Sequence, residues 1–534
     1  MATYNNNNDA DQPLGTSTDV ALASEGDGAA TPEVAHDLVH YARVPVNRIP
    51  FMPEKRDNDS MNAVQTSAGT YLRRILVYGI LSAVLFFIVW LFASETGRGL
   101  LFDWTSRGVL ANWFNGGIES TLNWQGVIVY ASIVALVLFL CILLFRYFLL
   151  MHMAYLNTAK FTMKEQAGND PNFTPPVSII VPAYNEGVLL KSTIASLLEM
   201  DYPLYEIIIV DDGSSDETRP VAQSLVGAYH DGRVQVKLVE KTNGGKSTAL
   251  NAGIQVSSYE FVLNVDGDSQ LSPDTLRKCI RHFTDPQVGA VAGNVKVLNR
   301  DNMLTTLQAL EYVEGLNMAR SAQSLVKLVN IIPGPLGMFR KDAIKQADWY
   351  SSDTFAEDCD ITLKIIRAGW RVEYEPDAKS YTEAPNKWLD LLKQRYRWTR
   401  GIIQAVRKHR DLFFNPTINF GGTIVMWAMA FESLIWPVMN VFANLYFIVI
   451  ALAFDLSYYL VYWWLSLTIL DLVAALYCVA VEKEEARLVF YSIFYRLFFI
   501  LIIDVCKTFA TIEEFLGIGM KWGKLKRIGA GVKG

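Results

Sequence analysis

The chain has few of the residues that build disulfide and zinc sites. Among its 534 residues are five cysteines, scattered with no CxxC pair, and six histidines without metal-ligand spacing. Such cysteines give no disulfide framework and are typical of a reducing compartment. Any metal should therefore bind to carboxylates, which favours Mg²⁺ or Mn²⁺ over zinc.

A surplus of basic residues is also missing. Lys and Arg number 48 against 54 Asp and Glu, and the formal net charge is −6. Nucleic-acid binding relies on basic side chains that displace phosphate counterions, so this balance argues against a nucleic-acid partner. It does not exclude a small anionic substrate that is held through a metal.

The N-terminal stretch, residues 1–70, has few aromatic residues and is rich in Asn, Ser, Thr, Gly and acids. It cannot bury enough apolar surface to offset chain entropy, so we expect a disordered cytosolic tail. The start of the chain also lacks the apolar core and the small-residue cleavage site of a signal peptide.

Apolar residues make up 51% of the chain and concentrate in two blocks, 71–151 and 418–512. In the first block, the runs 75–93 and 127–151 are each long enough to cross a bilayer. Arg and Lys residues flank these runs on the side of the tail and on the side of the segment after 151. The positive-inside rule then places both in the cytosol, and we expect a multi-pass protein of the plasma (inner) membrane.

The second block precedes a basic C-terminus, 513–534, which should also be cytosolic. Its first run is too long for one tilted helix, and a break at Pro437 would make it two short spans, giving about four in the block. Glu432 and Asp504 lie inside apolar runs, where they would face a pathway or pair with a neighbouring helix. The three runs are 418–454, 457–480 and 488–510.

Residues 152–385 alternate short β-branched runs with helical stretches, which predicts an α/β fold with a parallel sheet covered on both faces. Ligands of such sheets bind beyond the carboxyl ends of the strands. Those ends carry Glu186, Asp211–Asp212 and Asp266–Asp268, so acidic side chains should meet at the ligand site. The runs are VSIIVPAY, YEIIIVDDGS, VQVKLVE, YEFVLNVDGD and GAVAGNV.

Three of these motifs have the chemistry of a nucleotide site. Asp266 and Asp268 can reach one divalent cation that bridges a diphosphate, although the pattern also fits a solvated turn. Asp211 and Asp212 can accept hydrogen bonds from a ribose or a base edge, or they cap a turn that starts a helix. Lys246 follows a glycine pair that lacks P-loop spacing, and it is either a nucleotide contact or a surface lysine.

An acidic pair begins the predicted helix FAEDCDITLKIIRAGW. Asp358 suits the role of a base that takes a proton from an attacking hydroxyl, and Glu357 lies beside it. The alternative is an acidic first turn that complements the helix dipole. Cys359 next to them is better explained as a packing residue than as a nucleophile.

Residues 386–412 predict a basic amphipathic helix that lies in the membrane interface. Gln394, Arg397 and Trp398 fall within about one turn of it, so an amide, a guanidinium and an indole can address one pocket. Arg397 would pair with diphosphate oxygens, and Trp398 would stack on a sugar ring. Alternatively, the two are a membrane-facing Trp and a snorkelling Arg.

In chain order, VPAYNE, DDGSSD, DGD, IPGPLGMFR, ED and QRYRW resemble the motifs of the processive family 2 glycosyltransferases, the membrane-embedded β-polysaccharide synthases. The resemblance covers about 177–400. It implies a GT-A (Rossmann-like) domain of α/β fold inserted between transmembrane helices of a polytopic α-helical membrane protein. It also implies a UDP-sugar donor, a growing polysaccharide acceptor, Mg²⁺ or Mn²⁺ and, for some members, accessory subunits.

The resemblance also implies roles for individual residues. The usual Thr before the acid pair is Ala356 here, so that position offers no hydroxyl. The implied roles are Asp358 as general base, Asp211 and Asp212 for the uridine, Asp266 and Asp268 for the metal, Glu186 and Lys246 for the nucleotide, Glu357 for the substrate, Gln394, Arg397 and Trp398 for the donor diphosphate and the acceptor end, and Gly334 and Gly337 for the acceptor pocket.

Within the family, the segments around the ED pair and before QRYRW look most similar to bacterial poly-N-acetylglucosamine synthases, whereas IPGPLGMFR looks more like hyaluronan and chitin synthases. We therefore expect a processive inverting transferase that polymerises UDP-GlcNAc and moves the polymer across the membrane. The alternatives are a hyaluronan synthase that also uses UDP-GlcA, a β-glucan synthase that uses UDP-glucose, and a lipid-phosphate sugar transferase that adds one sugar. A transporter or receptor with a cation-binding acidic domain is the alternative outside enzymes.

Overall fold

The structure is a computed structural model that describes residues 39–40, 124–166, 173–453 and 457–518. All of them belong to one compact unit that begins at Val39. Of the tail predicted to be disordered, only Val39–His40 are described, and these two residues form a strand; the rest of the tail, the first predicted span and most of the basic C-terminus lie outside the described residues.

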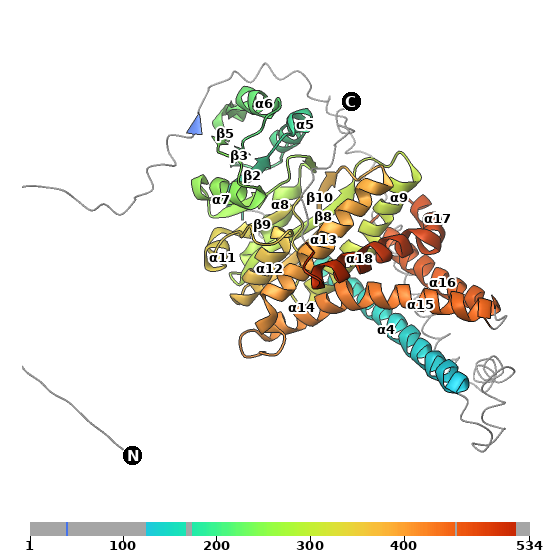
Figure 1. The fold of residues 1–534 in the computed structure, drawn as a ribbon. Coiled ribbons are helices and arrows are strands. Elements are labelled where there is room, and N and C mark those ends of the chain that lie inside the picture. Colours follow the sequence, from blue (N-terminus) through green and yellow to red (C-terminus); the bar gives the residue numbers. More distant parts are fainter. Residues whose placement is uncertain (1–38, 41–123, 167–172, 454–456, 519–534) are drawn as a thin grey trace, which may run out of the picture. The chain divides into compact units, whose positions relative to one another are not determined.

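One mixed sheet organises the part of the chain between the apolar blocks (Figure 1). Its strand order is β1-β5-β3-β2-β6-β9-β8-β10-β7, and β4 pairs with β5. The strands are β1 Val39–His40, β2 Val177–Ala183, β3 Tyr205–Asp211, β4 Gly227–Tyr229, β5 Val234–Glu240, β6 Phe261–Asn264, β7 Ser269–Leu271, β8 Val288–Val297, β9 Gly337–Arg340 and β10 Arg371–Thr382.

The prediction of a parallel sheet is right for the core but wrong for the inserted strand β9 and for β1, β4 and β7, which are antiparallel to their partners. Strands β5, β3, β2 and β6 are parallel, as are β8 and β10, but β9 lies between β6 and β8 and is antiparallel to both. Gly337 pairs with Asn264 at the carboxyl end of β6. The chain enters β9 at that edge and must therefore run back across the sheet.

Helices cover both faces of the sheet, as the continuous apolar strands predict. Ile179 and Ile207 pack with α5, α6 and α8, while Ile180 and Ile208 point to the opposite face and pack with α7, α11 and α12. Burial of each such side chain contributes about 1.5–3 kcal/mol. These helices are α5 Gly187–Leu198, α6 Thr218–Leu225, α7 Lys246–Val256, α8 Thr275–Ile280, α11 Lys341–Gln346 and α12 Glu357–Arg367.

Four helical segments among the described residues are long and apolar enough to cross a membrane: 137–160, 420–448, 463–481 and 487–515. The first lies in α4, which extends well beyond the predicted span. The helices outside the sheet layers are α4 Trp124–Gln166, α9 Met303–Leu310, α10 Met318–Leu325, α13 Trp388–Lys408, α14 Phe420–Ala430, α15 Trp436–Ala453, α16 Ser457–Val481, α17 Arg487–Phe494 and α18 Ile500–Phe515.

The predicted break at Pro437 does not occur. A π-helical segment, Phe431–Ile435, joins α14 to α15, so that one continuous helix passes through Pro437. A π turn is wider than an α turn, and it accommodates the proline ring and its missing N–H without ending the helix. The described part of this block therefore has three candidate spans where four were expected.

Glu432 and Asp504 each pair with a side chain of a neighbouring helix. Glu432 accepts two hydrogen bonds from the Arg146 guanidinium, at 2.8 and 2.5 Å. Asp504 accepts a hydrogen bond of 2.6 Å from the side-chain amide of Asn440. Of the two interpretations left open for Glu432 and Asp504, pairing with a neighbouring helix is confirmed.

A buried ion-pair cluster joins the sheet to the loop after α16. The Lys296 side chain on β8 is 2% exposed and pairs with Glu482 and, at 3.0 Å, with Glu484. Glu484 also accepts a hydrogen bond of 2.7 Å from Arg300. Because the charges are buried, the contact depends on all partners being present.

We predict that Lys296→Ala destabilises the protein by about 3–5 kcal/mol, because it leaves Glu482 buried without its cation. Thermal unfolding of the detergent-solubilised protein measures the effect. The matched control is Lys345→Ala, which removes an exposed lysine from a surface pair and should have almost no effect. Equal melting temperatures for the two variants would contradict the prediction.

Candidate active site

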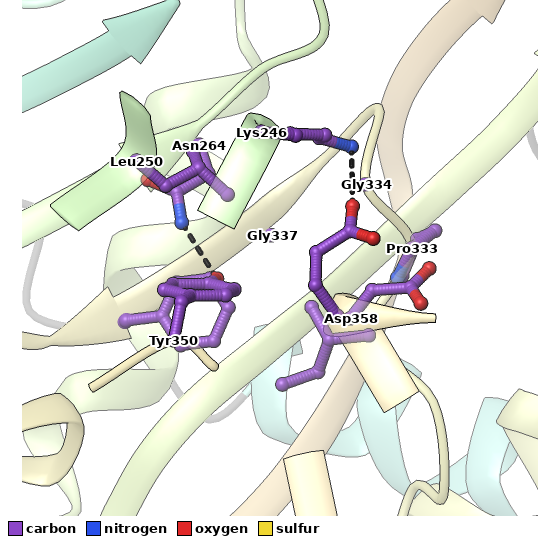
Figure 2. Close-up of a pocket in the computed structure, with 11 residues that line it drawn as sticks. Lys246, Leu250, Asn264, Pro333, Gly334, Gly337, Tyr350 and Asp358 are labelled. Carbon is purple, nitrogen blue, oxygen red and sulfur yellow. Dashed lines mark hydrogen bonds and ion pairs between the residues drawn. The ribbon is translucent and has the colours of Figure 1, made fainter. Parts of the chain in front are cut away.

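A pocket opens at the edge of the sheet where β6 ends and β9 begins (Figure 2). Together with the open space at its mouth it measures about 260 Å³. Its walls come from α7, β6, β9, the IPGPLG segment and the start of α12. The lining residues are Lys246, Leu250, Asn264, Ile332, Pro333, Gly334, Gly337, Phe339, Tyr350, Glu357 and Asp358.

Lys246 is the cationic centre of this pocket. It is the first residue of α7 and follows Gly245, whose φ of 87° is one that L side chains rarely adopt. Its Nζ lies 2.6 Å from Asp266 and 3.0 Å from Glu357. Burial opposes the charge, but the two carboxylates outweigh it and raise the pKa of Lys246 well above its usual range. The alternative interpretation of Lys246 as a surface lysine is therefore wrong.

The DGD turn brings carboxylates together beside Lys246. Burial and the nearby Asp268 raise the pKa of Asp266, although Lys246 counteracts them. The Glu186 carboxylate packs against the same turn, because a Cβ added to Gly267 would meet Glu186 Oε2 at 2.1 Å. The structure thus places three of the predicted acidic residues at one point, although they come from two separate strand ends.

This donor set fits a hard divalent cation. The described residues contain no cluster of three or more His, Cys, Asp or Glu side chains arranged to hold a metal by themselves. Mg²⁺ sites in phosphate-transferring enzymes typically use one or two carboxylates, with waters and substrate phosphates completing the shell. Asp266 and Asp268 supply such a partial set.

Asp211 and Asp212 are buried and already hold the neighbouring loops. Asp212 accepts hydrogen bonds from the backbone N–H groups of Gly244 and Gly245, at 3.0 and 2.8 Å, and pairs with Lys241. Asp211 accepts hydrogen bonds from Ser214 N–H and from Arg219. The two acids therefore shape the loop that delivers Lys246, and their contact with a uridine stays a prediction.

The acid pair stands at the first turn of α12. Asp358 lines the pocket, and its Oδ1 accepts a hydrogen bond of 2.8 Å from Cys359 N–H. Burial and the adjacent Glu357 raise the pKa of Asp358 to about 6, a value suited to a general base. The pKa of Glu357 is lowered despite its burial, because Lys246 stabilises the carboxylate. Asp358 can thus accept a proton at a pH at which Glu357 stays ionised.

Cys359 behaves as the sequence predicts. The side chain is fully buried among the apolar residues beneath the pocket. Burial raises the pKa of the thiol well above its usual range, so no thiolate is available as a nucleophile.

The QRYRW helix is confirmed as α13, but its side chains are arranged differently from the prediction. Gln394 accepts a hydrogen bond from Arg395 rather than pointing freely at a ligand. Arg395, which the sequence analysis did not single out, is buried, pairs with Glu311 and lies over the Trp398 ring at 4.3 Å. Arg397 is close enough to Glu357 to contribute to its lowered pKa. Only Arg397 of the predicted trio shows an influence on the acid pair.

Gly401 brings α13 directly against the acid pair. A Cβ at this position would lie 2.6 Å from the backbone nitrogen of Ala356, which precedes Glu357. The adjacent residue of α13, Arg400, pairs with Glu514 of α18 at 2.7 Å. One helix therefore contacts both the pocket and a candidate membrane segment.

Two polar lining residues, Asn264 and Tyr350, were missed by the sequence analysis. Asn264 ends β6 two residues before Asp266, a position that could have suggested a role. Tyr350 lies in a loop between α11 and α12 without any motif. Only the folded chain shows that they form a hydrogen-bonded pair, in which Asn264 Nδ2 donates to the Tyr350 hydroxyl at 2.8 Å.

Comparison with known proteins agrees with this geometry. Residues 175–401 match the family described as glycosyltransferase like family 2. The chain therefore carries a family 2 glycosyltransferase domain. A mannosyltransferase from Pyrobaculum calidifontis, solved in complex with GDP-Man and Mn²⁺, matches 69% of this chain and all of its own, with a TM-score of 0.50 and 21% identity. That likeness confirms the GT-A fold.

Two curated relatives of the chain are named poly-beta-1,6-N-acetyl-D-glucosamine synthase. The protein from Staphylococcus epidermidis is 33% identical over 48% of this chain and 61% of its own length. The one from Staphylococcus aureus strain COL is 32% identical over 49% of this chain and 62% of its own length. The match thus spans about three fifths of these relatives, and the resemblance to poly-N-acetylglucosamine synthases is confirmed at that level.

We predict that Gly401→Ala lowers transferase activity at least about tenfold, because the added methyl forces α13 away from the acid pair at a cost of about 1–3 kcal/mol. Initial rates and melting temperatures of the purified protein measure both effects. Gly315→Ala is the matched control, since a Cβ at Gly315 meets nothing within 4 Å. Full activity in both variants would show that activity does not need the close approach of α13 to Ala356.

Proposed function

We propose that the protein is an inverting, processive glycosyltransferase that polymerises UDP-GlcNAc into a β-linked polysaccharide and passes it across the plasma (inner) membrane. The observation that carries the proposal is the pocket in which Asp358, with a pKa near 6, lies together with Lys246. The names of the curated relatives support GlcNAc as the sugar and a polymer as the product.

The mechanism follows from the positions of the charged groups. Lys246, with Arg397 from α13, would bind the donor diphosphate, while Asp211 and Asp212 would bind the uridine. Asp266 and Asp268 would hold Mg²⁺ or Mn²⁺, which stabilises negative charge on the diphosphate. Glu186, beside the DGD turn, would support the nucleotide.

Transfer itself needs one base. Asp358 takes the proton of the acceptor hydroxyl, whose oxygen forms a bond to C1 of the sugar as the bond from C1 to the UDP oxygen breaks. Attack from the opposite face inverts the α-linked donor to a β-linked product. Gly334 and Gly337 leave room for the acceptor, and Trp398 would support its terminal sugar.

The proposed topology places the N-terminus, the glycosyltransferase domain and the C-terminus in the cytosol. The segment 487–515 is about 43 Å long at the α-helical rise, and both of its ends contact the glycosyltransferase domain or α13. Leu488 packs with residues of β8 and α9, and Glu514 pairs with Arg400. These contacts support a C-terminus on the side of the domain.

The donor is tested by radiolabel incorporation with the purified protein in detergent. UDP-GlcNAc, UDP-glucose and UDP-glucuronate are offered singly and in pairs. We expect polymer with UDP-GlcNAc alone. Incorporation only with UDP-GlcNAc and UDP-glucuronate together would indicate a hyaluronan synthase, and incorporation with UDP-glucose alone would indicate a β-glucan synthase.

We predict that Asp358→Asn lowers the transfer rate by about 10²–10⁴-fold, the range typical of a lost general base. The dissociation constant for UDP should stay unchanged, because Asp358 does not bind the nucleotide. Activity and UDP affinity are measured on the same preparation. Transfer at the normal rate by the variant would contradict the role of Asp358 as the base, and the alternative of a transporter or receptor survives if every UDP-sugar-dependent activity is unaffected by the substitution.

We also predict that activity falls as the pH drops through about 6. The folded-state pKa of Asp358 is raised to about 6, so the base is deprotonated above this pH and protonated below it. The pH dependence of kcat/KM for the free enzyme reports this group. An acidic limb near the ordinary aspartate pKa of about 3.9 would show that Asp358 is not the group that titrates.

A further inference from the structure

Asn264 and Tyr350 form a polar corner of the pocket that the proposed chemistry does not use. In Figure 2 they lie on one side of the pocket, and Asp358 and Pro333 lie on the other. Asn264 is 4% exposed, and its Nδ2 donates to the Tyr350 hydroxyl at 2.8 Å. Its Oδ1 accepts no hydrogen bond from any described residue. Buried carbonyl oxygens in folded proteins rarely lack a donor, so this one is oriented for a ligand.

The Tyr350 hydroxyl has the opposite capacity. Because it accepts from Asn264, its own proton is available to donate to a ligand. Burial raises the pKa of this phenol, which therefore stays protonated at physiological pH. The corner thus presents one acceptor, Asn264 Oδ1, and one donor, Tyr350 O–H, side by side.

Both groups are held rigidly. The backbone of Tyr350 exchanges two hydrogen bonds with the Asn251 side chain, at 3.0 and 2.9 Å. Its ring meets Phe339 edge to face, with ring centroids 6.3 Å apart. Asn264 is fixed at the end of β6, where it pairs with Gly337. A rigid donor and acceptor discriminate between ligands better than mobile ones do.

The rest of the corner is apolar. Leu250, Ile332 and Phe339 line the same pocket. A ligand group that fits here needs one N–H or O–H donor, one acceptor and an apolar end. An acetamido group has these three features, because its N–H donates, its carbonyl accepts and its methyl is apolar.

We propose that Asn264 and Tyr350 select the donor by binding its 2-acetamido group. The acetamido N–H donates to Asn264 Oδ1, the acetamido carbonyl accepts from Tyr350 O–H, and the methyl packs against the apolar residues of the corner. The inference rests on the proposed use of UDP-GlcNAc. A 2-hydroxyl sugar fills only part of the corner and leaves one buried polar group unpaired, which disfavours it.

The test compares UDP-GlcNAc with UDP-glucose in wild type, Tyr350→Phe and Asn264→Leu. We measure kcat/KM for sugar transfer and for hydrolysis to UDP with each donor, together with the dissociation constant for UDP. In each variant, kcat/KM for UDP-GlcNAc should fall about tenfold, which corresponds to the loss of one hydrogen bond. For UDP-glucose, kcat/KM should change little. The affinity for UDP should not change.

Tyr374→Phe is the matched control. Tyr374 is fully buried in the same domain, its hydroxyl has no hydrogen-bond partner among the described residues, and it does not line the pocket. This variant should retain the wild-type preference between donors. A loss of preference in Tyr374→Phe equal to that in Tyr350→Phe would assign the effect to general packing and overturn the inference.

A measurement on the unmodified protein covers the case in which a variant fails to fold. UDP-glucosamine lacks only the acetyl group. Its inhibition constant for polymer synthesis should be at least about tenfold higher than the dissociation constant of UDP-GlcNAc. Equal affinities for UDP-glucosamine and UDP-GlcNAc overturn the inference while the proposed function stands. So do variants whose kcat/KM falls by the same factor for UDP-GlcNAc and UDP-glucose. A wild-type chain that transfers glucose and not GlcNAc contradicts both.

Discussion

The ammonium group of Lys246 holds the active site together. It lies between Asp266, at the end of a strand, and Glu357, at the start of a helix, and these elements are far apart in the sequence. Without a cation, buried carboxylates from the two elements would repel each other. The glycines before Lys246, fixed by Asp212, start α7 at the point where its first side chain reaches both acids.

The same charge pattern prepares the site for its proposed substrates. Glu357 is kept ionised by Lys246, whereas Asp358 beside it has a pKa of about 6. Two adjacent carboxyl groups therefore have different protonation behaviour, which is the usual basis for separating a binding group from a base. The proposed diphosphate and its metal would meet one cation and a set of acids already at the edge of the sheet.

Helix α13 extends this arrangement toward the membrane segments. Gly401 allows it to touch the residue before the acid pair, and Arg395 and Arg400 attach it to Glu311 and Glu514. Because these pairs are buried, α13 cannot shift without breaking several of them. In the proposed function, this rigid connection would couple sugar transfer to movement of the product along the helices.

The sequence was sufficient to predict the strand ends and their acids, because the carboxyl ends of parallel strands converge on one edge. It was not sufficient for features that depend on distant contacts. The direction of β9 follows from the edge at which the chain enters it, and the continuity of the helix through Pro437 follows from a π turn. Tyr350 has no local motif, and only its contact with Asn264 gives it a place in the site.

The size of the product at low donor conversion tests the central claim most directly. Purified protein is incubated with labelled UDP-GlcNAc, and the products are separated by length while most donor remains. A transferase whose acceptor stays between the pocket and the membrane helices gives long β-linked chains from the start, with few intermediates. Products that carry a single added sugar, or that lengthen together as donor is consumed, would contradict processive synthesis.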